Sequence, residues 1–216
     1  MKTPITKQRI KQHLAYSSWK YILAAVLIVL GWNITFTMTA YRSPEDKVVD
    51  TYVYGLTDVS ALQTWVDGVH AEQMSDMEQM EALSLIADET YGSMILMTRM
   101  AAGEGDLYLL PKTEFTSYSG QGVFEPLEEI DGLLELFESH GIDLERGWYR
   151  NTETGERHLY GIPASCLPQL KSMLNASGEY YLSIRLNNNN EENTLKLFQI
   201  MVHELIEEPA TQTDLQ

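Results

Sequence analysis

Cysteine is almost missing from this 216-residue chain, which has a single one, Cys166. One cysteine cannot form a disulfide within the chain, so the fold must be held by a hydrophobic core. The part after residue 41 has 175 residues (216 minus 41), which is enough to bury such a core as one domain. Cys166 follows His158 by eight residues, but no third orienting group accompanies them, so we expect a buried, inert thiol.

Basic residues are scarce beyond residue 41. The chain has 15 basic and 31 acidic residues, and five of the bases precede residue 21. Residues 42–216 therefore hold 10 bases and 31 acids, a net charge of −21. Such a domain repels nucleic acid phosphates and anionic lipid head groups, which excludes both as partners. A solvated acidic face explains the charge most simply, although the charge also attracts cationic ligands.

Acidic residues are absent from the first 41 positions. The residues before position 21 carry only positive charge, from Lys2, Lys7, Arg9, Lys11 and Lys20. Residues 21–41 then run without any Asp, Glu, Lys or Arg. At about 1.5 Å per residue, a helix of this length reaches roughly 31 Å and crosses the hydrocarbon of a bilayer. The sequence therefore predicts a transmembrane anchor over 21–41.

The basic flank fixes the expected orientation of this signal-anchor, because basic segments stay in the cytoplasm. We expect a cytoplasmic tail over 1–20, an extracellular α/β domain over 42–209 and a flexible tail over 210–216. The alternative is a cleaved signal peptide, since the most apolar part, residues 21–32, is short. Met38, however, occupies the position where a small residue is needed for cleavage.

Motifs that carry catalysis are also missing. His203-Glu204 begins like a zinc-protease helix, but position 207 is Glu where the second His is required. The segment GEGD at 103–106 lacks the Lys-Ser/Thr of a phosphate-binding loop. Methionines at 74, 77 and 80 and at 94, 97 and 100 have the spacing of a Cu(I) site, but core filling is the simpler interpretation. We predict no enzymatic activity, no cofactor and no metal.

The pattern after residue 42 alternates β-rich runs with helical periodicity, which is typical of an α/β domain with a mostly parallel sheet. Its expected parallel strands are 48–54, 81–87 and 106–110. Helices are expected near 58–70, 93–102, 114–119, 133–139 and 190–207. A β-hairpin is expected from Trp148, with Thr154-Gly155 in its loop, and a strand over 180–186. In the last helix, Leu195, Phe198, Val202 and Leu205 are the expected core residues.

Several short motifs resemble the first lobe of bacterial extracellular solute-binding proteins of the sugar-binding type (family 1). They are VYGLTDVSALQTW, AAGEGDLYLLPKTEF, GQGVFEPLEE and HLYGIPAS, with Gly103, Gly105, Asp106, Gly122, Pro126-Leu127 and Tyr160-Gly161-Ile162-Pro163. The resemblance implies a periplasmic-binding-protein-like lobe behind one transmembrane helix. In that family the chain leaves for a second lobe after the YGIP-like segment. Here only the 14 residues 165–178 follow before the closing strand, which implies a single lobe.

Ligands of open α/β sheets bind beyond the carboxyl ends of the strands. The resemblance therefore implies contacts from the loops there, and we expect Thr57, Asp58, Glu89, Tyr91 and Lys112 to contact a ligand or partner. The alternative is that Asp58 only caps a helix and Tyr91 only packs. The expected function is a membrane-anchored interaction module that contacts a transporter, an envelope component or another protein. A small-molecule receptor for a sugar or peptide is the alternative. The oligomeric state stays open.

Overall fold

The computed structural model describes residues 7–39, 41, 43–56, 58–88, 91–186 and 190–207. The chain divides into two compact units, residues 1–42 and 43–216, and each is described by itself. The tail expected over 210–216 lies outside the described residues.

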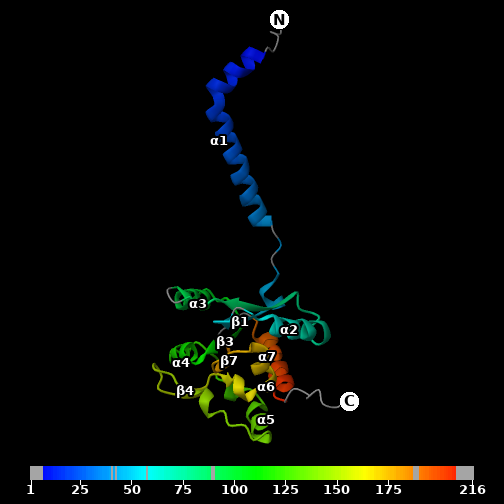
Figure 1. Ribbon diagram of the computed structural model, residues 1–216, viewed down its shortest axis with the longest axis vertical. Coiled ribbons are helices and arrows are strands. Elements are labelled where there is room, and N and C mark those ends of the chain that lie inside the picture. The colour runs from blue at the N-terminus through cyan, green and yellow to red at the C-terminus, as the bar shows by residue number, and fades with distance from the viewer. Residues whose placement is uncertain are drawn as a thin grey trace. The chain divides into compact units, whose positions relative to one another are not determined.

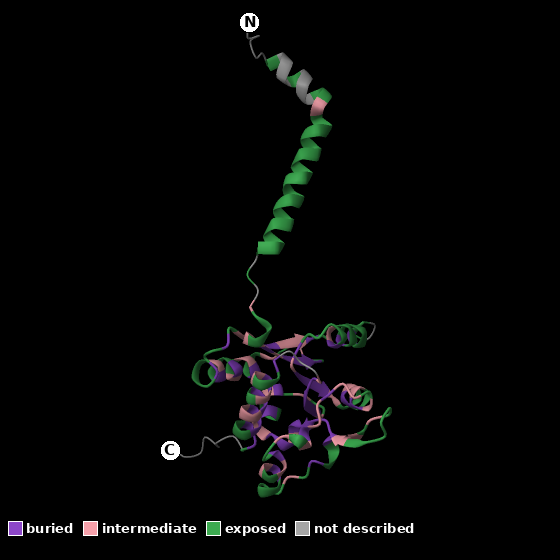
Figure 2. Cartoon of the chain, turned by 180° about the vertical axis from the view of Figure 1, so that it is seen from behind, coloured by how far each residue is buried: buried purple, intermediate pink, exposed green. Residues whose placement is uncertain are grey.

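Helix α1 (Lys7–Thr39) forms the first unit, and its described side chains are exposed except Ser17, which is half-buried (Figure 2). It begins 14 residues before the predicted anchor (21 minus 7), because the basic segment also consists of residues that form helices. Ala15–Thr39 is long and apolar enough to cross a membrane. Thr35, Thr37 and Thr39 each donate a hydrogen bond of 2.7–2.8 Å to the carbonyl four residues earlier. These bonds reduce the cost of placing hydroxyl groups in an apolar environment.

The second unit alternates strands and helices, as the sequence predicts. Its strands are β1 (Val48–Tyr54), β2 (Gln79–Leu85), β3 (Leu107–Pro111), β4 (Trp148–Arg150), β5 (Arg157–Leu159), β6 (Ile162–Pro163) and β7 (Tyr180–Ile184). Its α-helices are α2 (Ser60–Glu72), α3 (Gly92–Ala101), α4 (Lys112–Gly120), α5 (Leu133–Ser139), α6 (Pro168–Leu174) and α7 (Glu191–Leu205). Four 3-10 turns are η1 (Glu45–Lys47), η2 (Leu127–Glu129), η3 (Glu145–Gly147) and η4 (Ala164–Cys166).

The central sheet has five strands in the order β2-β1-β3-β7-β6. β1 pairs in parallel with both β2 and β3, while β7 is antiparallel to β3 and to β6. The predicted α/β class and mostly parallel sheet are therefore confirmed, because four strands run in one direction. The register places Tyr180 opposite Pro111 and Ile184 opposite Leu107. The end of β7 thus lies beside the start of β3.

Helices cover both faces of this sheet, with α2, α6 and α7 on one side and α3 and α4 on the other (Figure 1). The first face packs an aliphatic and methionine core, which includes Met74, Met77 and Met80. The second face packs an aromatic core, in which the Phe115 and Tyr181 rings stack with centroids 4.2 Å apart. Because both faces of the sheet are buried, β3 and β7 consist almost entirely of apolar residues.

Three details differ from the sequence prediction. β2 begins two residues earlier than expected, at Gln79. The segment between the YGIP motif and β7 contains α6, which the sequence pattern did not reveal because it spans only two turns after Pro168. Leu195, predicted for the core, is half-buried, and Leu197 takes the buried position instead. The helix therefore turns its buried stripe slightly away from Leu195.

Candidate functional site

The carboxyl ends of β1, β2 and β3 lie at one edge of the sheet, which we call the carboxyl edge. The parallel pairing of β1 with its two neighbours brings them together. Gly55 follows β1 with φ +85°, a left-handed conformation that glycine adopts without strain. An added Cβ there would come 3.3 Å from the Tyr180 hydroxyl. The chain therefore leaves β1 through a tight turn against the start of β7.

Asp58 acts as a cap at the carboxyl edge. Its Oδ1 accepts hydrogen bonds from the Ser60 backbone N–H (3.0 Å) and the Ser60 hydroxyl (2.7 Å). These bonds lower the pKa of the Asp58 carboxyl, so it is ionised at neutral pH. Asp58 also lines a cavity of about 200 Å³ with Leu56, Ser60, Ala61, Met173, Leu174 and Asn175. The predicted contacts Thr57 and Glu89 lie outside the described residues.

Tyr91 and Lys112 lie on the neighbouring loops of the same edge. Tyr91 precedes α3, where its backbone N–H donates to Asp88 Oδ1 over 3.0 Å and its ring is 57% exposed. Lys112 is the exposed first residue of α4. Each of these residues belongs to a separate loop, and the cavity beside Asp58 is lined by neither. The structure thus shows Asp58 bonded to Ser60 at the start of α2 and the Tyr91 ring exposed.

Three tyrosines that lie at this edge were not predicted from the sequence. Tyr54 ends β1, Tyr180 begins β7 and Tyr118 lies in α4, and Glu114 acts electrostatically on all three. Burial raises the pKa of each phenol, and the Glu114 carboxylate adds to the rise. The signal was in the sequence, since Tyr54 closes a predicted strand. Tyr180 could not be placed there without knowing that β7 runs antiparallel.

The opposite edge of the sheet, where β1 and β3 begin, is the amino edge, and it contains larger cavities. One of about 550 Å³ lies between the chain around η2 and helix α7. Its lining is Glu125, Pro126, Glu129, Ile130, Asp131, Ile184, Leu186, Glu191, Leu195 and Gln199. A second, of about 380 Å³, borders Asp50, Tyr52, Asp106 and Arg185.

Asp50 and Asp106 form a paired carboxylate site in the smaller amino-edge cavity. The Asp106 carboxylate accepts a 2.9 Å hydrogen bond from the Asp50 backbone N–H. Burial, followed by the nearby charges of Asp106 and Glu81, raises the pKa of Asp50 to about 6. The Oδ1 atom of Asp50 is buried without a hydrogen-bond partner. This carboxyl is therefore a cost to the folded state when it is ionised.

Arg185, the residue that follows β7, lines the same cavity. Its side chain is buried, and it donates to the carbonyls of Gly105 (2.7 Å) and Gly103 (2.9 Å). The guanidinium thus binds the turn between α3 and β3, and both glycines of that turn have φ +76°. Burial raises the pKa of Asp106, and the hydrogen bond from the Asp50 N–H and the charge of Arg185 offset part of that rise.

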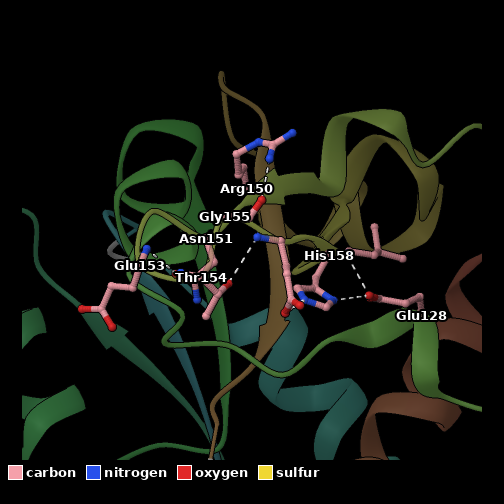
Figure 3. A network of polar contacts seen from close by, with 9 residues as sticks. Glu128, Arg150, Asn151, Glu153, Thr154, Gly155 and His158 are labelled. Carbon is pink, nitrogen blue, oxygen red and sulfur yellow. Dashed lines mark hydrogen bonds and ion pairs between the residues drawn. The ribbon is translucent and has the colours of Figure 1, made fainter.

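A polar network joins the β4–β5 hairpin to η2 (Figure 3). His158 Nδ1 lies 2.6 Å from Glu128 Oε1, and the other oxygen of Glu128 accepts the Leu159 backbone N–H over 2.9 Å. The Glu128 hydrogen bond raises the pKa of His158. The hairpin loop is ordered by Asn151, whose Oδ1 accepts the N–H groups of Glu153 (2.8 Å) and Thr154 (3.2 Å). The network fixes a hairpin and brings no reactive pair together.

Three other groups singled out in the sequence are structural. Cys166 is buried, and burial raises the pKa of its thiol, which keeps it protonated as expected. Glu204 accepts a 3.0 Å hydrogen bond from Trp65 Nε1 and one from Gln73, so it ties α7 to α2. In the second methionine series, Met100 fills the core as expected, whereas Met94 and Met97 are more than half exposed and do not.

No protein-family model matches the sequence, and no curated protein matches it. Solved extracellular solute-binding proteins are similar to part of the chain in structure. A family 1 member from Alicyclobacillus acidocaldarius is 16% identical with a TM-score of 0.40, and the match covers 56% of this chain and 29% of that one. An ABC substrate-binding protein from Listeria monocytogenes in complex with cycloalternan is 17% identical, with a TM-score of 0.38 and coverages of 54% and 28%.

A third neighbour is the galacto-N-biose/lacto-N-biose I-binding protein of the Bifidobacterium longum ABC transporter, solved with lacto-N-biose. It is 22% identical with a TM-score of 0.33, and the match covers 54% of this chain and 28% of that one. All three belong to the class that the sequence motifs resemble. The chain spans less than a third of the length of each neighbour.

Proposed function

We propose that the protein is a membrane-anchored binding module whose domain faces outward and contacts a macromolecular partner through the carboxyl edge. The partner would be a transporter, an envelope component or another protein. Within this proposal, residues 1–20 stay in the cytoplasm, 21–41 span the membrane and 42–209 form the outer domain. The basic charge before the apolar helix supports this orientation.

The observation that carries the proposal is the shape of the carboxyl edge. Its cavity of about 200 Å³ is smaller than the roughly 300–1,000 Å³ of ordinary small-molecule sites. Tyr91 and Ile86 are instead 57% and 66% exposed on neighbouring positions of this edge. Exposed aromatic and aliphatic side chains with a nearby carboxylate suit a protein or polymer surface.

Topology is tested first, by adding protease to intact, wall-stripped cells. The domain after Arg42 should be removed, because it faces the medium. Complete protection of the domain would contradict the orientation. A released form that begins near Tyr41 would instead support the cleaved signal peptide.

The binding face is tested by cross-linking the anchored protein in cells. The triple change Asp58→Ala, Glu89→Ala and Tyr91→Ala should abolish the cross-linked partner band while the thermal melt moves little. The matched control replaces Glu72 and Glu138, exposed carboxylates of α2 and α5 outside this edge, and it should retain the band. A band that persists in the first variant would move the binding face elsewhere.

A small-molecule receptor is the second candidate, because the exposed Tyr91 ring at this edge offers area on which a ligand could stack. Its ligand would be a sugar or a short peptide held weakly at the strand-end loops. The full-length protein in nanodiscs is screened by thermal shift against sugars and peptides. A saturable stabilisation of about 2 kcal/mol at high ligand excess would favour the receptor over the interaction module.

A further inference from the structure

The larger amino-edge cavity, of about 550 Å³, is lined by both apolar and acidic side chains. We call it the η2–α7 groove. Its lining includes Ile130 and Leu195, both of them half-buried, and the exposed carboxylates Glu129, Asp131 and Glu191. No basic side chain is among the described residues that line it. Apolar side chains that the domain core leaves partly uncovered therefore share one groove with several negative charges.

Two segments contribute the carboxylates of this groove. The chain that follows Phe124, which pairs with Arg185, carries Pro126, Glu129, Ile130 and Asp131. Helix α7 presents Glu191, Leu195 and Gln199 at intervals of four residues, which places them on one face. The carboxylates thus come from both segments. A ligand with several cations along its length would match this spacing better than a ligand with one.

We propose that the η2–α7 groove binds a basic peptide segment of another protein, in which apolar side chains alternate with Lys or Arg. The apolar side chains would cover Ile130 and Leu195, and the cations would face Glu129, Asp131 and Glu191. The net charge of −21 on residues 42–216 favours the approach of such a segment. The groove lies at the opposite edge of the sheet from the strand-end loops, so this binding is additional to the proposed function.

The test measures fluorescence anisotropy of a short labelled peptide of alternating Lys and Leu. It is titrated with the full-length protein in zwitterionic nanodiscs, and empty nanodiscs provide the blank. The peptide should bind with an affinity that falls as salt rises, because part of the attraction is between charges. Peptides of alternating Glu and Leu, or Lys and Ser, should bind at least about tenfold more weakly, since each lacks one of the two features.

Two pairs of variants separate the groove from the charge of the whole domain. The change Glu129→Lys with Asp131→Lys should weaken binding at least about tenfold, as expected for loss of close charge pairs. The matched control, Glu72→Lys with Glu153→Lys, alters net charge equally outside the groove and should weaken it less than about threefold. Leu195→Ser should also weaken binding, and Ile86→Ser at the carboxyl edge should not. If the lysine variant fails to fold, Glu129→Gln with Asp131→Asn replaces it.

Three results would overturn the proposal. Equal losses in the groove variant and its charge-matched control would show general electrostatic attraction. Spermidine that competes as well as the peptide would show a small-amine site. A dimer in light scattering, without peptide binding, would show that a second copy covers the groove. The triple change at Asp58, Glu89 and Tyr91 should leave peptide binding unaltered, which distinguishes this test from that of the proposed function.

Discussion

The two edges of the central sheet differ in how much room they leave for a ligand. At the carboxyl edge, Tyr54 and Tyr180 fill the space between the strand ends and are 5% and 6% exposed. The cavity beside Asp58 measures about 200 Å³. At the amino edge, the two cavities measure about 550 and 380 Å³ and are lined by carboxylates. The rule that ligands bind at the carboxyl ends of strands thus points to the carboxyl edge, where side chains leave less open volume than at the amino edge.

The antiparallel strand β7 explains this difference. It brings its first residue, Tyr180, to the carboxyl edge and its last residues to the amino edge. Arg185 and Leu186 then border the amino-edge cavities, together with the start of α7. A sheet with parallel strands alone would place these residues at the other edge. The direction of one strand therefore decides where the open surface lies.

The largest effect is expected from Gly105→Ala at the amino edge. An added Cβ would come 2.3 Å from the Tyr52 ring, at a position with φ +76°. Overpacking and left-handed strain should together cost about 2–4 kcal/mol in the free energy of unfolding. Gly103→Ala is the matched control, because it has the same φ but its added Cβ would meet nothing closer than 4.0 Å.

The control should cost about 1 kcal/mol, since only the backbone preference is lost. Urea unfolding of the full-length protein in detergent measures both values. Equal losses at the two glycines would mean that Tyr52 moves aside without cost. The lining of the smaller amino-edge cavity, which includes Tyr52, would then be able to change its conformation at little cost in free energy.

Asp50→Asn tests the charge of the same edge. The pKa of Asp50 is raised from 3.8 to about 6 in the folded protein, so the folded state holds this proton more tightly than the unfolded state. Its contribution to stability is full below pH 3.8 and is lost as pH rises through 6. At pH 7 the ionised group should therefore cost about 1–2 kcal/mol, because the side chain is only half-buried and solvent screens part of the effect. The variant should melt higher than the natural protein at pH 7, and the difference should shrink toward pH 4.

Melting curves taken between pH 4 and pH 8 decide this prediction. Glu81→Gln provides the control, because Glu81 acts on Asp50 only through its charge. It should give a smaller gain with the same sign. A variant Asp50→Asn that melts lower at pH 7 would show that the carboxylate has a stabilising partner.

A smaller effect is expected at His158, which links the hairpin to η2 beside the groove. Its pKa is raised by Glu128, so the stability that it contributes is present below pH 6.5 and is lost as pH rises through the raised pKa. His158→Gln should cost less than about 1 kcal/mol at pH 5.5, because the pair is partly exposed, and almost nothing at pH 9. Arg157→Gln in the same strand should show no such pH dependence.

The sequence predicted the elements whose pattern is local. The strand over 48–54 and the helix over 133–139 have the predicted bounds, and the hairpin lies where Thr154-Gly155 indicates. The direction of β7 could not be predicted from the sequence. Its antiparallel pairing with β3 depends on contacts between residues about 70 positions apart (180 minus 111 is 69). Residues placed by that direction, such as Tyr180 and Arg185, were missed for the same reason.

The location of the candidate site could be predicted in part, while its role in binding stays a prediction. The rule for strand ends led to Asp58, Tyr91 and Lys112, which the structure places at one edge, since the rule needs only the order of strands and loops. The rule could not distinguish a residue that caps a helix from one that contacts a ligand, because both are exposed polar residues in loops. The prediction for Leu195 failed for a different reason. This apolar residue has the spacing of a core residue, but a small rotation of the helix leaves it half-buried.

The smallest effects on stability are expected at the carboxyl edge, from Tyr91→Ala and Asp58→Ala. The Tyr91 ring is 57% exposed, so its removal should leave the melting temperature within about 1 °C. Asp58→Ala should lower it slightly more, because the Ser60 N–H and hydroxyl lose their acceptor. Thermal melts of both variants beside Gly105→Ala measure the contrast. A Tyr91→Ala variant as unstable as Gly105→Ala would mean that the ring supports the fold, and its exposure could then no longer be attributed to a partner. A stable variant would leave partner binding as the role that the cross-linking experiment tests.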